Sequence, residues 1–143
     1  MRELRREIEI DAAPAIVWAV LTDTGTYPDW NPFVRRLNGE LREGAKLEVE
    51  IAPPDSRAMT FKPTVLTAHA DRELRWLGRF LLPGLLDGEH SFRIEPLPGG
   101  RSRFTQSERF TGILVRFVGK TLDRTQVGFA QMNEALKRRA EAS

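Results

Sequence analysis

Three polar residues in the second half of the chain, His90, Gln106 and Glu108, have the types and spacing to act together. They lie in two segments, 88–96 and 102–110, where hydrophobic and polar residues alternate, and this pattern predicts two β-strands. A Pro-Gly-Gly turn between the segments predicts an antiparallel hairpin, whose register would set His90 opposite Glu108 with both side chains facing the interior. Such a pair, with Gln106 beside it, could orient a mostly hydrophobic ligand or act as a general acid and base. It could equally be a self-satisfied pair in the core, because a lone buried charge is costly.

The residue inventory argues against several other kinds of site. Cysteine is absent, which excludes disulfides, thiol nucleophiles and cysteine metal sites. His69 and His90 have no metal-ligand spacing with carboxylates, and the sequence has neither a glycine-rich phosphate loop nor a G-x-S-x-G motif. We therefore expect no metal and no cofactor, and a binding role is favoured over catalysis.

The charge balance argues against nucleic acid as a partner. The chain has 22 Lys and Arg against 20 Asp and Glu, a formal net charge of +2, which is too small to draw in a polyanion. The first residues lack the hydrophobic core of a signal peptide, and no hydrophobic run approaches the length of a membrane span. We expect a cytoplasmic protein without stable membrane insertion, either a monomer or a weak homodimer.

The N-terminal part predicts a strand followed by two short helices. Alternation in residues 4–10 predicts a half-buried strand. Residues 14–22 are hydrophobic almost all round, and Pro14 suits the first turn of a helix, so we expect this helix to be largely buried. Thr26, followed three residues later by Asp29, predicts a capping box at the start of the second helix.

The remaining chain predicts a sheet and one long helix. Six further strands are expected, and their short connections favour an antiparallel sheet; they are 34–41, 45–51, 58–69, 73–80, 88–96 and 102–110. From about Gly112 to Ala140, hydrophobic residues recur at three- and four-residue spacing, which predicts a helix of about 40 Å. The sequence thus predicts one α+β domain, residues 1–143, in which a curled antiparallel sheet surrounds a helix and leaves a hydrophobic hollow.

Large hydrophobic residues could line that hollow beside the three polar groups, although each is equally explicable as core. The candidates are Trp30, Phe61, Trp76, Phe92, Leu114, Phe117, Phe129 and Met132. Within the helix, Gly119 and Gly128 are expected to permit a bend or a close approach, because glycine costs about 1 kcal/mol there relative to alanine.

A hydrophobic segment that begins at Phe80, where the predicted strand 73–80 ends, could serve as a lid over the hollow. Leu82, Leu85 and Leu86 surround a Pro-Gly turn, and loops normally lie at the surface, where hydrophobic patches usually have a function. A dimer contact, a membrane contact and a simple continuation of the strand are the alternatives.

Several short motifs together resemble the START-like superfamily, also called SRPBCC, and within it the polyketide cyclase/dehydrase and lipid-transport group. They are Ile10, Ala13-Pro14, Val17-Trp18, the Tyr27-Pro-Asp-Trp-Asn-Pro-Phe33 segment, Leu74-Arg-Trp-Leu-Gly78, His90-Ser-Phe92 and Glu108-Arg-Phe-Thr-Gly112. The resemblance covers essentially the whole chain. It implies a helix-grip fold, in which a seven-stranded antiparallel sheet wraps around the C-terminal helix, two short helices close the sheet, and a cavity holds hydrophobic ligands.

The resemblance leaves three functions open. It implies a binder or carrier of a small hydrophobic molecule, a cyclase or dehydratase, or a co-chaperone-like interaction module. By position, Trp76, His90, Gln106 and Glu108 would face the cavity. We expect non-catalytic binding or transport of a lipid-like or aromatic ligand; in the enzyme alternative, Glu108 and His90 would be the acid and base.

Overall fold

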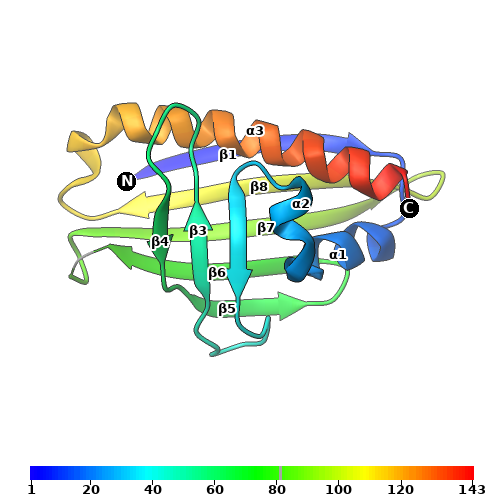
Figure 1. The fold of residues 1–143 in the computed structure, drawn as a ribbon, viewed down its shortest axis with the longest axis horizontal. Coiled ribbons are helices and arrows are strands. Elements are labelled where there is room, and N and C mark those ends of the chain that lie inside the picture. Colours follow the sequence, from blue (N-terminus) through cyan, green and yellow to red (C-terminus); the bar gives the residue numbers. More distant parts are fainter. Residues whose placement is uncertain (81) are drawn as a thin grey trace.

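Strands of alternating hydrophobic and charged residues build a large antiparallel sheet that is hydrophobic on one face. In the computed structural model, which describes residues 1–80 and 82–143, its five strands follow the order β1-β8-β7-β6-β5 (Figure 1). These strands are β1 (Arg2–Ile10), β5 (Thr64–His69), β6 (Glu73–Phe80), β7 (Leu86–Leu97) and β8 (Arg101–Thr111). The β7–β8 hairpin has the predicted register, with His90 opposite Glu108.

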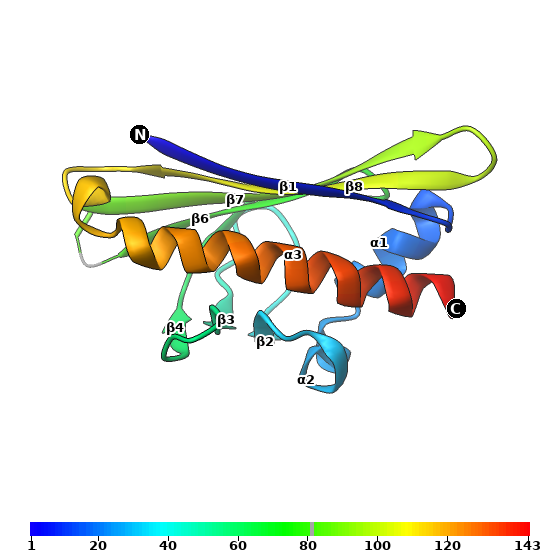
Figure 2. The same ribbon diagram turned by 90° about the horizontal axis from the view of Figure 1, so that it is seen from above.

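A smaller antiparallel sheet lies on the same side of the large sheet as the C-terminal helix (Figure 2). Its strands, in the order β2-β3-β4, are β2 (Val34–Asn38), β3 (Glu48–Ile51) and β4 (Met59–Phe61). The two sheets meet where Lys46 pairs with Thr64 and the Leu47 amide donates to the Pro63 carbonyl over 2.9 Å.

The division into two sheets differs from the expected single sheet of seven strands. The predicted strand 58–69 is interrupted at Pro63 and becomes β4 and β5, so that the described residues form eight strands. Proline has no amide hydrogen to donate to a ladder, which explains the break at this residue. The α+β class and the antiparallel pairing are as predicted.

Two short helices follow β1, as predicted, but their details differ. Helix α1 (Pro14–Thr22) buries Val17, Val20 and Leu21, whereas Ala15, Ile16 and Ala19 are exposed, so the expectation of a largely buried helix is wrong. The helix packs against one end of the sheet and α3, and one side is therefore left to solvent.

The second helix, α2 (Tyr27–Trp30), follows a 3₁₀ turn (Thr24–Thr26) and has no capping box. Thr26 already has helical backbone angles, and its hydroxyl donates to the Asp23 carbonyl over 2.7 Å while accepting from Trp30 Nε1 over 3.0 Å. Because the hydroxyl is engaged in this way, it does not cap the following amides, and Asp29 stays exposed.

Helix α3 (Gly119–Glu141) crosses the inner face of the large sheet (Figure 2). Its 23 residues span about 35 Å, which agrees with the predicted long helix. No helix in the described part of the chain is both long and hydrophobic enough to cross a membrane.

The predicted start of this helix near Gly112 is wrong. Residues 112–118 form a loop with a 3₁₀ turn (Val115–Phe117), and the Leu114 amide donates to the Leu85 carbonyl over 3.0 Å. Gly112 has φ +115°, and a Cβ atom there would lie 2.4 Å from the Leu85 carbonyl oxygen. The chain therefore turns at Gly112 in a conformation suited to glycine, and the helix begins after the turn.

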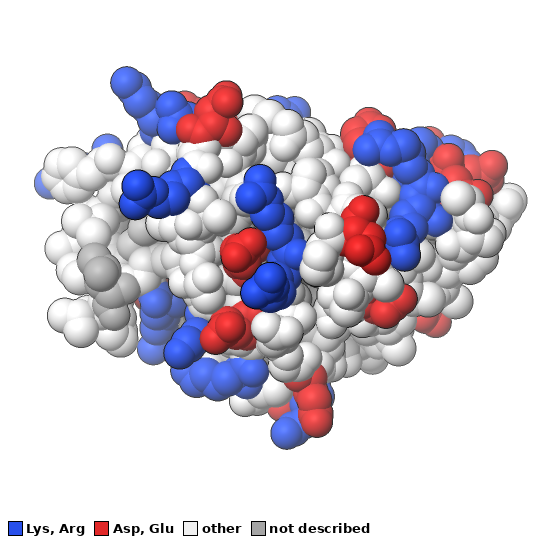
Figure 3. All heavy atoms as spheres, in the orientation of Figure 1, with Lys and Arg blue, Asp and Glu red and all other residues white. Residues whose placement is uncertain are grey.

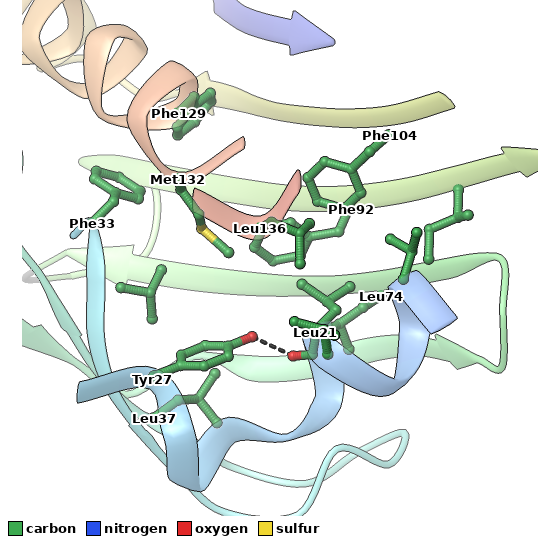
Figure 4. Packing of buried hydrophobic residues seen from close by; sticks show 14 of the residues in the cluster. Leu21, Tyr27, Phe33, Leu37, Leu74, Phe92, Phe104, Phe129, Met132 and Leu136 are labelled. Carbon is green, nitrogen blue, oxygen red and sulfur yellow. Dashed lines mark hydrogen bonds between the residues drawn. The ribbon is translucent and has the colours of Figure 1, made fainter. Parts of the chain in front are cut away.

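The core fills the space between α3, the large sheet and the short helices. Figure 4 shows Leu136 of α3 beside Phe92 and Phe104 of the sheet, with Met132 and Phe129 further along the helix, and all five side chains are buried. Below them, the buried Tyr27 hydroxyl donates to the Leu21 carbonyl and ties α2 to α1. Burial, with a smaller effect from the charge of Asp23, raises the pKa of the Tyr27 phenol.

Charges of both signs are interspersed on the face of the molecule that Figure 3 shows. On the face that carries the small sheet, Figure 3 shows basic and acidic side chains alternating, with a larger uncharged area at the end where the 82–86 and 112–118 loops lie. Leu82, Ile113 and Phe117 are exposed there. The distribution fits the small net charge and shows no broad basic field on this view.

Candidate functional site

A cavity of about 590 Å³ lies between the two sheets and the first turns of α3. Its volume is within the range usual for small-molecule sites. Its walls are mostly hydrophobic side chains from both sheets and the helix, among them Phe33, Ile51, Phe61, Phe80, Phe110 and Leu122. A molecule inside would therefore exchange water for hydrophobic contacts over most of its surface.

The inner wall carries a buried histidine and carboxylate in direct contact. His90 Nδ1 lies 3.0 Å from Glu108 Oε1, as the hairpin register predicts, and both residues line the cavity. His90 is 1% exposed, whereas Glu108 keeps 11% of its side chain accessible. Glu108 is thus the end of the pair that a ligand can reach.

The pair continues into a chain of hydrogen bonds behind the wall. His90 Nε2 lies 2.8 Å from Gln106 Oε1, and Gln106 Nε2 donates to Asn133 Oδ1 over 3.0 Å. Asn133 Nδ2 in turn donates to the Arg6 backbone carbonyl over 3.2 Å. The chain links β7 and β8 to α3 and β1, and every side chain in it is buried.

Aromatic rings surround the His90 imidazole on the remaining sides. The ring centroids of Trp76, Phe92 and Phe129 lie 5.2, 4.5 and 5.1 Å from that of His90. These rings hold the imidazole in place and exclude water from it, so hydrogen bonds within the chain are stronger than they would be in solvent.

Two glycines face each other across β6 and β7 beside this wall. Gly78 pairs with Gly88, and both line the cavity. A Cβ atom on Gly88 would lie 2.4 Å from Glu108 Oε2 and 3.2 Å from Phe110 Cε1. The absence of a side chain at Gly88 therefore makes room for the outer oxygen of Glu108.

The structure brings some of the predicted ligand contacts together in this cavity and places others elsewhere. Phe61, Trp76, His90, Glu108 and Leu86 line it. Four more lie behind its wall in the core, because their side chains are buried between α3 and the large sheet and do not reach the open space; they are Phe92, Gln106, Phe129 and Met132. Their contribution to binding stays a prediction.

The remaining candidates lie away from the cavity. Trp30 packs edge-on against Tyr27 with centroids 5.3 Å apart, at the end of the molecule formed by the short helices. Leu114 and Phe117 precede the helix instead of lying on it, and Phe117 is 70% exposed beneath the Arg116 guanidinium. Of the predicted lid, Leu86 borders the cavity, whereas Leu82 is exposed and Leu85 is half-buried outside it.

Sequence reasoning missed several residues of the site. Phe110 and Gly88 share the inward faces of Glu108 and His90, two residues away on each strand, so the period-2 pattern could have found them. Asn133 had a weaker signal, a polar residue within the hydrophobic stripe of α3. Phe33 is brought to the cavity by the connection into β2, for which the sequence has no periodic signal.

Within residues 1–80 and 82–143, no group of three or more His, Asp and Glu side chains could hold a metal ion.

Two basic residues, Lys62 and Arg79, border the cavity. Both are exposed, and neither forms an ion pair with any described residue.

Solved structures with the same fold share little sequence with this chain. Hypothetical protein jhp0584 from Helicobacter pylori has a TM-score of 0.78 at 16% identity, over 97% of this chain and 88% of its own. TTHA0849 from Thermus thermophilus has 0.76 at 16%, over 99% and 98%. The ZhuI aromatase/cyclase from Streptomyces sp. R1128 has 0.73 at 17%, over 98% and 93%. At these identities the likeness establishes the fold alone.

The sequence itself supports a family assignment. No curated protein matches the chain. Residues 1–141, however, match the family described as polyketide cyclase / dehydrase and lipid transport, which confirms the resemblance seen in the motifs. Because this match extends over nearly the entire chain, the protein belongs to the polyketide cyclase/dehydrase and lipid-transport family.

Proposed function

We propose that this protein binds and carries a small hydrophobic molecule in its cavity without a chemical step. The observation that carries the proposal is the cavity of about 590 Å³, with mostly hydrophobic walls and a few polar groups gathered at one wall. Ligand sites usually combine a hydrophobic surface with a small number of orienting polar groups. The family description, which includes lipid transport, supports this direction.

A test is to ask whether hydrophobic molecules stabilise the purified protein. Native mass spectrometry of protein purified without delipidation should show an added mass, and thermal unfolding with aromatic or lipid-like probes should show raised midpoints. A ligand at 100 times its Kd adds about 2.7 kcal/mol to the free energy of unfolding. If no probe raises the midpoint and no added mass is seen, the proposal is wrong.

A matched pair of variants locates the effect. Ile51 lines the cavity from β3 and is half-buried, so Ile51→Trp should fill part of the space and reduce the ligand-dependent shift. Glu95 lies exposed on the opposite face of the large sheet, and Glu95→Trp should leave the shift unchanged. Equal shifts in both variants would place binding outside the cavity.

The contact between His90 and Glu108 favours a second candidate, an enzyme of the cyclase or dehydratase type. A carboxylate that borders the cavity and is held by a buried imidazole can transfer a proton to or from a ligand. The aromatase/cyclase among the structural neighbours makes this chemistry a reasonable alternative. For this candidate, Glu108→Gln should abolish turnover of a polyketide-like substrate while retaining affinity, and undiminished turnover would exclude it.

A further inference from the structure

The hydrogen-bond chain behind the cavity bears on the chemistry of the ligand, on the condition that the proposed binding function holds. We infer that the cavity selects hydrophobic molecules that carry a hydrogen-bond donor, such as a hydroxyl, a phenol or an N–H group. Glu108 Oε2 accepts that hydrogen bond. The direction of each hydrogen bond in the chain leads to this assignment.

The direction is set at the far end of the chain, by a backbone carbonyl. The Arg6 oxygen can only accept, so the Asn133 group 3.2 Å from it must be the amide nitrogen. The Asn133 oxygen then faces Gln106 and can only accept as well. Gln106 must therefore present its nitrogen to Asn133, at 3.0 Å, and its oxygen to His90.

The orientation of Gln106 determines the tautomer of His90. Gln106 Oε1 lies 2.8 Å from Nε2 and only accepts, so Nε2 carries a hydrogen. The other ring nitrogen, Nδ1, faces Glu108 Oε1 at 3.0 Å. One proton must lie between these two atoms, because two unprotonated acceptors at this separation would repel each other.

That proton can be bonded to either atom, and the hydrogen-bonding role of Glu108 Oε2 toward the cavity is the same. If it is on Nδ1, the pair is an imidazolium and a carboxylate, and Glu108 Oε2 is a carboxylate oxygen. If it is on Oε1, Glu108 is a neutral acid that donates to Nδ1, and Oε2 is its carbonyl oxygen. In both cases Oε2 accepts hydrogen bonds and donates none. A second proton on the pair would leave a buried imidazolium without a counter-ion, which is costly.

The position of Oε2 makes it available to a ligand. It forms no hydrogen bond with any described side chain, and its space next to Gly88 exists because that residue has no Cβ. Glu108 keeps 11% of its side chain accessible and lines the cavity. A bound molecule with a donor at this point would satisfy Oε2, whereas a molecule with only acceptors would cover it without a partner, which is unfavourable.

Three probes of similar size test the inference: 2-naphthol, 2-methoxynaphthalene and 2-methylnaphthalene. Isothermal titration calorimetry of the purified full chain at pH 7 should show 2-naphthol binding about tenfold more tightly than each of the other two, the effect of one hydrogen bond to the outer oxygen of the Glu108 carboxyl group. Equal affinities for all three would overturn the inference and leave hydrophobic binding intact. Failure of all three to bind would overturn the proposed function itself, and the inference with it.

Variants of Glu108 test whether its outer oxygen, Oε2, is the hydrogen-bond acceptor. In Glu108→Met the preference should disappear, and 2-naphthol should bind no more tightly than the other two probes. In Glu108→Gln it should fall only to about threefold, because the amide nitrogen can donate to His90 Nδ1 and leave the weaker amide oxygen facing the cavity. A complete loss in Glu108→Gln would contradict the assigned directions. Glu95→Gln, on the exposed outer face, should keep the tenfold preference.

The tautomer has a readout that does not depend on a ligand or on a variant. Nitrogen-15 NMR of the imidazole at pH 7 should show a proton on Nε2 of His90. A resonance pattern with Nε2 unprotonated would overturn the inference.

Discussion

Replacing Gln106 and Asn133 by leucine, singly and together, tests whether the buried polar groups form one connected chain. Gln106→Leu leaves two groups without partners, the His90 Nε2–H and Asn133 Oδ1. Each buried unpaired group costs about 1–3 kcal/mol, so the variant should lose about 2–6 kcal/mol of unfolding free energy. Asn133→Leu removes the partner of the buried Gln106 amide and of the Arg6 backbone carbonyl, and should lose at least about 1–3 kcal/mol.

The double variant should be less destabilised than the sum of the two single variants. It contains neither of the groups that face each other in the native chain, so the penalties for Asn133 Oδ1 and Gln106 Nε2 both disappear. At about 1 kcal/mol or more for each, the coupling energy should be about 2 kcal/mol. Such a value is well above the departures from additivity seen for independent sites.

The assay is urea unfolding followed by tryptophan fluorescence, with all four proteins at the same pH and with unchanged m-values as the condition for comparison. As a control, Asn38→Leu and Gln131→Leu replace exposed residues of the same two types, on β2 and α3, and should be additive. A coupling energy below about 0.5 kcal/mol for Gln106 and Asn133 would refute the chain and the His90 tautomer derived from it.

Three further predictions concern other parts of the molecule. Gly128→Ala should lower the unfolding free energy by about 1 kcal/mol or more and weaken probe binding, because the new Cβ would lie 2.4 Å from Cδ1 of the buried Phe33 ring, which borders the cavity; urea unfolding and calorimetry measure the two effects. Tyr27→Phe should cost about 1 kcal/mol at pH 7 through loss of the hydrogen bond to the Leu21 carbonyl. Since burial raises the pKa of Tyr27, the stability that this residue contributes is complete below about pH 10 and is lost as pH rises further. The unfolding free energy of Tyr27→Phe should therefore decline less steeply with pH than that of the wild type in the alkaline range. Leu86→Ser should weaken 2-naphthol binding about threefold or more by removing a hydrophobic side chain from the cavity border.

Controls and contrary outcomes follow from the same contacts. Gly25→Ala should be neutral or slightly stabilising, because no atom lies within 4 Å of the place that its new Cβ would take, and a Gly128→Ala protein of wild-type stability would contradict the close approach to Phe33. Leu82→Ser, at an exposed position outside the cavity, should leave 2-naphthol affinity unchanged. If it weakened binding as much as Leu86→Ser, the loop would act as a whole. If the unfolding free energy of Tyr27→Phe fell as steeply at alkaline pH as that of the wild type, groups other than Tyr27 would cause the decline.

The part of the site that was predictable is the part specified by local patterns. The alternation along β7 and β8 has a period of two residues, and the hairpin connection keeps the two strands in register, so the contact of His90 with Glu108 could be derived without any knowledge of the rest of the fold. Asn133 could not be assigned in this way, because its partners depend on how α3 packs on β1, 127 residues away in the chain.

The errors in the prediction arise where a hydrophobic pattern has more than one explanation. Residues 112–118 continue the periodicity of α3, yet backbone hydrogen bonds to the 84–85 turn and the positive φ of Gly112 place them in a loop. Likewise, Phe92 and Phe129 have the same pattern as Trp76, but they pack behind the cavity wall instead of lining it. Spacing identifies an inward face and does not tell a wall from a filled core.

The break at Pro63 has a kinetic consequence. Because β4 and β5 are separate strands, the small sheet is connected to the large one mainly around Lys46 and Thr64, and the cavity lies between the two. A bound ligand can then escape by local opening of the small sheet, at a free energy below that of global unfolding. The rate of ligand release should accordingly correlate with the rate of amide hydrogen exchange in β2, β3 and β4 more closely than with the rate of exchange in β7 and β8.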